Sequence, residues 1–480
     1  MNSDFSKSEY DAIIVGSGPN GLSCAIELAR HGLSVVVVER NEIPGGGAKT
    51  AELTLPGFHH DVCSTVHPLG IASPFFKSIS LEKHGLKWIH SPVEVAHPFE
   101  DGDVSLLKRS VPETARLMGR DEGPWLKLFE HFARNADALM ADILAPPIHF
   151  PKTPGLFAMF GMKALLPADV LTWKYFKDER ARGLFTGIAA HSCADLSGMA
   201  TSAVGIALTV AGHGRGWPFP EGGSKNITLA LIDCLYSSGG EVVTGIDIQN
   251  VDELPQSKWV FFDLTPKQIL KIAGHHLPPR IVSSYNKFLY GPGIFKIDWA
   301  LDGPIPWKNP ETAKAATVHL GGNHEHIVRA EAAVQNGGIS DKPFVLLVQP
   351  TLFDQTRAPP GKHIAWAYCH VPNGSNIDRT GLIEDQIERY APGFKKLILK
   401  KHILSPEKLE AQNPNLIGGD IAGGLVDARQ LFFRPRIGLH PYRLDGKKFW
   451  ICSSSTPPGP GVHGMSGYHA AHALLKTNDI

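Results

Sequence analysis

The chain has 480 residues and a formal net charge of zero, with 43% hydrophobic and 20% charged residues. This composition is typical of a globular protein, and the length exceeds one ordinary hydrophobic core, so we expect two or three domains. The balanced charge gives no electrostatic basis for binding nucleic acid. Residues 1–9 resemble no signal peptide, and no apolar run approaches the ~20 residues that cross a bilayer, so we expect a cytoplasmic protein.

The stretch 10–40 predicts a β-α-β unit. The apolar run 12–15 predicts a strand buried on both faces, and 35–38 predicts a second such strand. Between them, residues 22–29 carry apolar side chains at helical spacing. This pattern predicts the start of a Rossmann-like α/β domain.

The turn between the first strand and the helix is rich in glycine. Gly16, Gly18 and Gly21 give Gly-x-Gly-x-x-Gly, and Pro19 and Asn20 complete the motif. Such glycines permit a tight turn, a close approach to a pyrophosphate and close packing of helix on strand. The helix N-terminus also offers free N–H groups to phosphates. We therefore predict that these five residues bind a dinucleotide.

An acidic residue directly follows the second predicted strand. Glu39, followed by Arg40, stands where a carboxylate accepts hydrogen bonds from ribose hydroxyls. Because this acid disfavours a cofactor with a 2′-phosphate, FAD and NAD both stay open at this point.

A second glycine run follows at 45–47. Three consecutive glycines after a strand indicate backbone that approaches another group closely or adopts positive φ. We predict that Gly46, Gly47, Ala48 and Lys49 face the phosphates of the cofactor, with an ordinary flexible turn as the alternative.

These motifs together resemble the FAD-binding start of the phytoene desaturase and amine oxidase flavoproteins. That group usually has an arginine directly after its Gly-Gly pair, whereas this chain has Gly47 there and a cation only at Lys49. The resemblance implies FAD as the cofactor. It also implies an α/β fold, in which a Rossmann-like FAD-binding domain is built from discontinuous segments. An α+β substrate-binding domain with a mixed sheet and a helical lid completes that fold.

The resemblance also implies domain boundaries. It assigns 1–75, 208–265 and 418–480 to the FAD-binding domain, 76–207 to the helical lid region and 266–417 to the substrate-binding domain.

The stretch 449–471 extends the resemblance to the other end of the chain. A strand leads into a Gly/Pro-rich turn and a helix of small residues, as in the family's C-terminal motif, where the last helix directs its positive end at the flavin. The implied FAD contacts here are Ser454, Gly461, Val462, His463, Gly464 and Met465. A strand at 242–243 is implied to bring Val243 to the nucleotide.

Histidines are our candidates for proton transfer, namely His463, His67 and His213. No cysteine or carboxylate stands at a recognisable metal spacing around the histidines of 59–67, so we predict no metal site. The six cysteines form no Cys-x-x-Cys, and we expect buried thiols that act as small hydrophobic side chains.

The segment 146–173 is rich in Met and Phe and is interrupted by prolines. One interpretation is a buried helical hairpin. The other is a mobile lid that contacts a membrane, with Lys152, Lys163 and Lys174 available for anionic head groups.

Two alternating segments predict strands of the substrate-binding half, at 295–301 and 363–370. Their aromatic residues Trp299, Trp366 and Tyr368 are expected to fill a core, with a pocket wall as the alternative.

The resemblance implies an oxidoreductase that takes a hydride from a small apolar substrate, polyene- or lipid-like, and passes electrons to oxygen or a quinone. One alternative is a flavin-dependent double-bond isomerase without net redox change. Another is a non-catalytic, FAD-containing interaction protein. The sequence leaves homo-oligomerisation open.

Overall fold

Five parallel strands form the sheet that carries the glycine-rich turn. In the computed structural model, which describes residues 5–445 and 447–478, their spatial order is β16-β10-β1-β2-β9. Their bounds are β1 Glu9–Val15, β2 Val35–Val38, β9 Glu241–Val243, β10 Gln256–Phe262 and β16 Phe449–Ile451. The strands expected at 12–15, 35–38 and 242–243 are therefore present in one sheet.

Helices cover both faces of this sheet, because successive strand residues point to opposite sides and both sets are apolar. Ile14 and Val37 share one core with α1 (Pro19–Arg30), α11 (Lys225–Ser237) and α18 (Met465–Asn478). The other core, which contains Ile13 and Val36, includes α12 (Pro266–Ala273) and α13 (Pro279–Asn286). These last two helices fall in the range expected for the substrate-binding domain, yet their apolar faces pack on the nucleotide-binding sheet.

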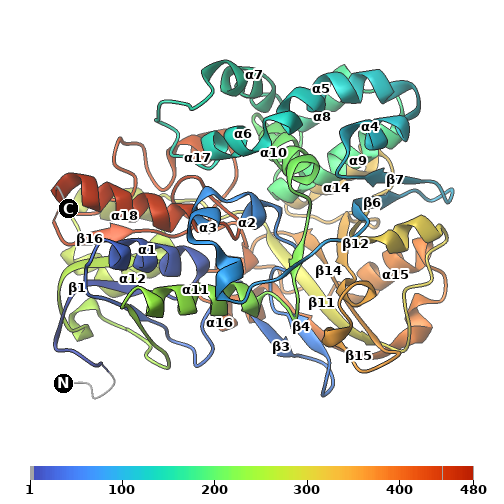
Figure 1. The fold of residues 1–480 in the computed structure, drawn as a ribbon. Helices are drawn as coiled ribbons and strands as arrows, with labels where there is room; N and C mark the ends of the chain where they lie inside the picture. The colour runs from blue at the N-terminus through green and yellow to red at the C-terminus, as the bar shows by residue number, and fades with distance from the viewer. Residues whose placement is uncertain (1–4, 446, 479–480) are drawn as a thin grey trace.

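The first and last helices lie side by side (Figure 1). A Cβ atom at Gly467 would lie 1.8 Å from the carbonyl oxygen of Asn20, so only glycine allows α18 to approach α1 this closely. This contact brings the C-terminal motif beside the glycine-rich turn.

A second sheet has seven strands in the order β15-β11-β14-β13-β12-β6-β7. Their bounds are β6 Val93–Pro98, β7 Val104–Leu107, β11 Gly293–Leu301, β12 Ala315–Leu320, β13 Val345–Val348, β14 His363–Val371 and β15 Ile398–Leu404. Only β12 and β6 pair in parallel within it. The region 76–207 was expected to be helical, but β6 and β7 extend this sheet because β6 is buried throughout and pairs with β12.

The two faces of the second sheet meet different elements. On one face, Ile297 and Leu347 share a core with α15 (Thr380–Tyr390). On the other, Leu346 and Val348 face a group of helices that gathers at one end of the molecule (Figure 1). These helices are α4 Val111–Arg116, α5 Glu122–Arg134, α6 Ala136–Ile143, α7 Pro154–Ala164, α8 Ala168–Tyr175, α9 Glu179–Ala189 and α10 Thr201–Gly214.

Further strands and α-helices complete the fold. They are β3 Thr50–Glu52, β4 His59–Asp61, β5 Trp88–Ile89, β8 Phe219–Pro220, α2 Pro68–Ala72, α3 Pro74–Ile79, α14 His324–Gln335, α16 Pro406–Gln412 and α17 Ala428–Phe433.

Candidate functional site

One cavity of about 840 Å³ is lined by residues of both sheets and of the helical region. At its nucleotide-binding end lie the loop after β1, the end of β2 and the second glycine run. At its apolar end lie α10, β13 and β14, which contribute Val204, Leu208, Leu346, Val348, Trp366 and Tyr368. A polar, glycine-rich wall and an apolar wall therefore enclose one continuous space.

Most of the residues predicted to bind the cofactor line this cavity. They are Gly16, Gly18, Pro19, Asn20, Glu39, Arg40, Gly46, Gly47, Lys49, Ser454, Gly461 and Val462. The others do not line it: Gly21, Ala48, Val243, His463, Gly464 and Met465. Their contacts with a cofactor stay predictions.

The Glu39 carboxylate is buried at the end of β2 and is held by its own neighbours. Its Oε2 accepts hydrogen bonds from Ser17 N at 3.1 Å and Ser17 Oγ at 2.6 Å. Its Oε1 accepts from Asn41 N at 3.0 Å and Asn41 Nδ2 at 2.8 Å. Each oxygen thus already accepts two hydrogen bonds, so a ribose hydroxyl must displace one of these donors.

A second acid, Asp263, follows β10 and lies under the glycine-rich turn. Its Oδ2 accepts a hydrogen bond from Gly21 N at 3.0 Å, within the first turn of α1. Burial raises the pKa of the Asp263 carboxyl to about 7, opposed by the hydrogen bond from Gly21 and reinforced by the charge of Glu39. Sequence reasoning missed this residue, although an acid directly after an apolar strand was a visible signal.

Lys49 is partly buried on the same wall of the cavity. Burial lowers its pKa, the negative charge of Glu39 raises it, and the net shift is downward. The structure thus places a cation at the nucleotide-binding end, two residues after the position where the family usually has arginine.

Of the three predicted proton-transfer histidines, only His67 lines the cavity. Its Nε2 lies 2.8 Å from Ser224 Oγ, and burial lowers its pKa to about 4. The imidazole of His67 is therefore neutral at pH 7.

The other two histidines lie elsewhere. His463 is buried but does not line the cavity, and its Nδ1 accepts a hydrogen bond from Met465 N at 3.0 Å. His213 is a correction: it lies in the helical core, where its Nε2 accepts a hydrogen bond from Trp125 Nε1 at 3.2 Å. An apolar helix, α10, positions His213 against α5 and away from the cavity.

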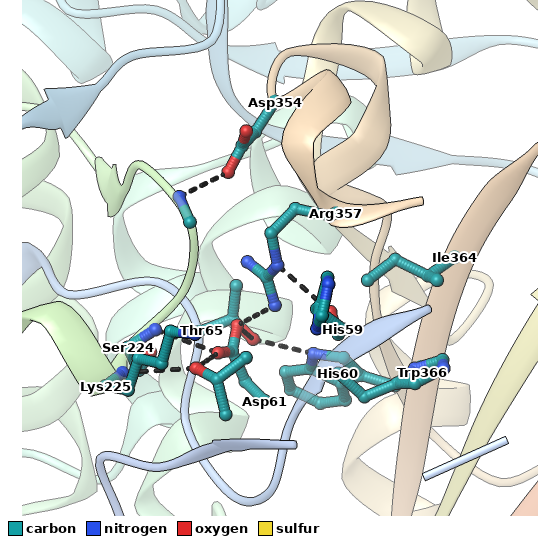
Figure 2. Close-up of polar contacts among 12 residues, drawn as sticks. His59, His60, Asp61, Thr65, Ser224, Lys225, Asp354, Arg357, Ile364 and Trp366 are labelled. Atoms are coloured by element: carbon teal, nitrogen blue, oxygen red, sulfur yellow. Dashed lines mark hydrogen bonds and ion pairs between the residues drawn. The ribbon is translucent and has the colours of Figure 1, made fainter. Parts of the chain in front are cut away.

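Asp61 and Arg357 form a buried ion pair beside Thr65 and Ser224 (Figure 2). Asp61 on β4 lies 2.9 Å from Arg357 and accepts hydrogen bonds from Thr65 Oγ1 at 2.8 Å and Ser224 N at 2.8 Å. Thr65 in turn accepts a hydrogen bond from Trp366 Nε1 at 2.7 Å. The Asp61 carboxylate therefore holds Ser224, which contacts His67, and Thr65, which contacts Trp366. His67 and Trp366 both line the cavity.

The aromatic residues of the second sheet divide between core and cavity. Trp299 packs against Phe394 with ring centroids 5.3 Å apart, as expected for a core side chain. Trp366 and Tyr368, also expected in a core, line the cavity with their rings stacked at 5.9 Å. They differ because β14 presents these two side chains to the helical region, where the cavity lies.

Asp252, His275 and His276 are the one group in the described part of the chain whose geometry could hold a metal ion. All three are exposed, and none lines the cavity. The site described here is therefore built without them.

A Rossmann-like sheet with a glycine-rich turn, joined to a mixed sheet by a shared cavity, is the architecture of a dinucleotide-binding protein. A family model described as an NAD(P)-binding Rossmann-like domain matches residues 14–77. The chain is 31% identical to hydroxyneurosporene desaturase of Cereibacter sphaeroides, over 96% of this chain and 97% of that protein. It therefore belongs to the phytoene desaturase-like family of FAD-dependent oxidoreductases.

Two further similarities agree with this assignment. The chain is 26% identical to mouse pyridine nucleotide-disulfide oxidoreductase domain-containing protein 2, over 98% of this chain and 94% of the mouse protein. Its fold matches that of an oxidoreductase from Methanosarcina mazei with a TM-score of 0.64, at 14% identity over 97% and 99% of the two chains. The expected fold class and the family resemblance are confirmed.

Proposed function

We propose that this protein binds FAD and oxidises an apolar, polyene- or lipid-like substrate at a C–H bond. The observation that supports the proposal most strongly is the single cavity, which joins the glycine-rich nucleotide end to the apolar walls of α10, β13 and β14. A cofactor and an apolar substrate can meet there without leaving the protein.

The residues at the nucleotide end fit FAD. At Gly18 a Cβ atom would lie 2.4 Å from Asp263 Oδ2, so the backbone at this turn has room only for hydrogen beside a bound phosphate. The N-terminus of α1 and Lys49 supply positive charge for the pyrophosphate, and Glu39 stands at the ribose position. When bound, FAD would supply the two-electron acceptor, and its electrons would pass to oxygen or a quinone.

The chain's own residues would orient the substrate and exclude water. Leu346, Val348 and Trp366 form an apolar wall that favours a hydrocarbon substrate over water. His67, neutral and held by Ser224, is the predicted proton-transfer histidine that lies on the cavity wall.

The visible absorption spectrum of the purified protein tests this proposal. Flavin bands that bleach on anaerobic addition of a lipid extract are the expected result, and the bleaching then serves as an assay to fractionate the substrate. Absence of flavin contradicts the proposal. Flavin that stays oxidised, while the extract changes composition only with added reductant, indicates the isomerase instead. Flavin that responds to neither extract nor dithionite indicates a non-catalytic protein.

FAD affinity is expected to fall as pH rises through 7. Since the pKa of Asp263 lies near 7, its carboxyl becomes negative over this range beside the pyrophosphate position. We expect the dissociation constant of FAD to increase about tenfold between pH 6 and pH 8. Asp263→Asn retains an oxygen for Gly21 N and should bind FAD with the same affinity at both pH values, as measured by fluorescence titration.

Asp247→Asn is the matched control, because Asp247 also lines the cavity but is half exposed to solvent. This variant should keep the pH dependence of the wild type. A wild-type affinity that is constant from pH 6 to pH 8 would contradict the assigned role of Asp263.

The segment 146–173 presents apolar side chains to solvent. The exposed ones on α7, α8 and the preceding loop are Ile148, Phe150, Met159, Met162, Leu165, Val170 and Trp173. Among the described residues no single helix is long and apolar enough to cross a membrane, and α7 with α8 reaches that length only across a 102° bend. We propose that this α7–α8 surface lies on an anionic membrane, with Lys152, Lys163 and Lys174 close to the head groups.

Phe150→Ser combined with Met162→Ser should weaken binding to anionic lipid vesicles at least about tenfold, because each apolar side chain contributes ~1.5–3 kcal/mol when it leaves water. These side chains are 90% and 67% exposed. Vesicle co-sedimentation measures the effect. Ile437→Ser with Leu439→Ser, at 67% and 74% exposure elsewhere on the surface, should leave binding unchanged. Equal losses in both double variants would count against this surface.

A further inference from the structure

A cysteine, a histidine and a glutamate form a hydrogen-bonded chain at the apolar end of the cavity. Cys193 Sγ lies 3.2 Å from His370 Nε2, and His370 Nδ1 lies 2.7 Å from Glu331 Oε2. Three elements supply them: the turn after α9, strand β14 and helix α14. This is the order of nucleophile, base and orienting acid that activates a cysteine.

Cys193 is held in a strained backbone conformation on the cavity wall. Its φ of 51° and ψ of 39° lie in the left-handed region, which costs a non-glycine residue on the order of 1–3 kcal/mol. The Cys193 N–H donates to Ala190 O at 3.0 Å, and its carbonyl accepts from Gln335 Nε2 at 3.3 Å. Because Gln335 and Glu331 share helix α14, one element fixes both ends of the chain of hydrogen bonds.

The charges around His370 favour its protonated form. Burial lowers its pKa, but Cys193 and Glu331 outweigh burial and hold the pKa well above its usual value. The neighbouring His191 is neutral, since burial and the charge of His370 lower its pKa to about 3. The buried phenol of Tyr368, whose pKa is raised, also stays neutral. The protonated His370 ring therefore lies between the Cys193 sulfur and the Glu331 carboxylate, with its Nε2 proton directed at the sulfur.

The residue that precedes Cys193 carries a buried hydroxyl group. Ser192 lines the cavity, and its Oγ is buried without a hydrogen-bond partner among the described residues. A buried unpaired hydroxyl is costly unless a ligand satisfies it, so it indicates a polar group on an otherwise apolar ligand.

We propose that Cys193 captures the carbonyl carbon of an apolar aldehyde in this cavity as a thiohemiacetal. The thiolate sulfur forms the C–S bond, and the π pair of the C=O bond moves to oxygen. The proton on His370 Nε2 then moves to that oxygen, which Ser192 Oγ is available to hydrogen-bond. Glu331 is a positioning residue. The step consumes no oxidant or reductant, and it goes beyond the redox function proposed above without depending on it.

Alkylation by iodoacetamide, followed at Cys193 by peptide mass spectrometry, tests the proposal on the purified protein with any cofactor it retains. The Cys63→Ala background removes the partly exposed thiol that also lines the cavity. We expect the alkylation rate of Cys193 to fall less than about threefold from pH 8 to pH 6.5, whereas the alkylation rate of an ordinary thiol falls about 25-fold over this range. In His370→Asn the alkylation rate of Cys193 should depend on pH as that of an ordinary thiol does. In Glu331→Gln the pH dependence should lie between that of an ordinary thiol and that of the wild type. His191→Asn, which alters a neighbouring histidine side chain, should keep the flat profile.

Protection by decanal tests the carbonyl chemistry. Decanal should slow the alkylation of Cys193 at least about tenfold, and decane, of equal chain length, should not. Equal protection by both compounds overturns the carbonyl capture. If Cys193 of the wild type is not alkylated, or if its alkylation rate depends on pH as that of an ordinary thiol does, the proposal that Cys193 reacts as a thiolate is wrong. If His370→Asn does not fold, Glu331→Gln decides the comparison. The readout is a covalent mass, so it does not change if the redox function fails.

Discussion

Gly18→Ala should yield a folded protein that binds FAD about 10- to 100-fold more weakly than the wild type. The added Cβ atom would lie 2.4 Å from Asp263 Oδ2, so either this carboxyl gives up its hydrogen bond from Gly21 N or the turn moves. Overpacking of this kind costs ~1–3 kcal/mol, and the displaced backbone is the part that faces the pyrophosphate. Fluorescence titration of the apoprotein with FAD measures the loss.

Gly123→Ala provides the matched control, because a Cβ atom there meets nothing within 4 Å. Its FAD affinity should equal that of the wild type. Unaltered FAD affinity in Gly18→Ala would show that the cofactor does not contact this turn.

Asp61→Asn should lower the free energy of unfolding by about 3–5 kcal/mol, since it leaves the buried Arg357 without its anion. Although burial opposes it, Arg357 and the hydrogen bonds from Thr50 and Ser224 hold the pKa of Asp61 below its usual value. The stability from this charge is therefore present at neutral pH and is lost as pH falls through the folded-state pKa. Urea unfolding at pH 7 measures the effect.

A double-mutant cycle distinguishes the contribution of the ion pair to stability from the effect of lost packing. Arg357→Met alone leaves the buried Asp61 carboxylate without a cation. Asp61→Asn combined with Arg357→Met removes both charges and should recover part of the lost free energy of unfolding. Asp302→Asn disrupts a solvent-exposed pair with Lys362 and should cost less than about 1 kcal/mol. If the losses of unfolding free energy in the two single variants simply add in the double variant, Asp61 and Arg357 do not stabilise the protein as a pair.

The nucleotide-binding half could be predicted from local patterns because its elements follow one another along the chain. Periodicity and glycine spacing located β1, α1 and β2, and Glu39 follows them at the cavity. The C-terminal motif was recognisable for the same reason, since strand, turn and helix lie within one short stretch.

The substrate half was less predictable, because there long-range contacts determine the environment of each side chain. The segment containing β6 and β7 was expected to be helical, but these strands pair with each other, and β6 also pairs with β12, more than 200 residues away. His213 was placed at the active centre by sequence, while the packing of α10 on α5 places it in a core.

The sequence by itself determined the fold class, the dinucleotide-binding turn and the family, because each depends on residues that are neighbours in the chain. Only the tertiary structure decided that Asp263 lies against Gly21, and that Cys193, His370 and Glu331 meet. These pairs are separated by 242, 177 and 39 positions, so no local spacing encodes them. Their proximity arises only when the two sheets and the helices enclose the cavity.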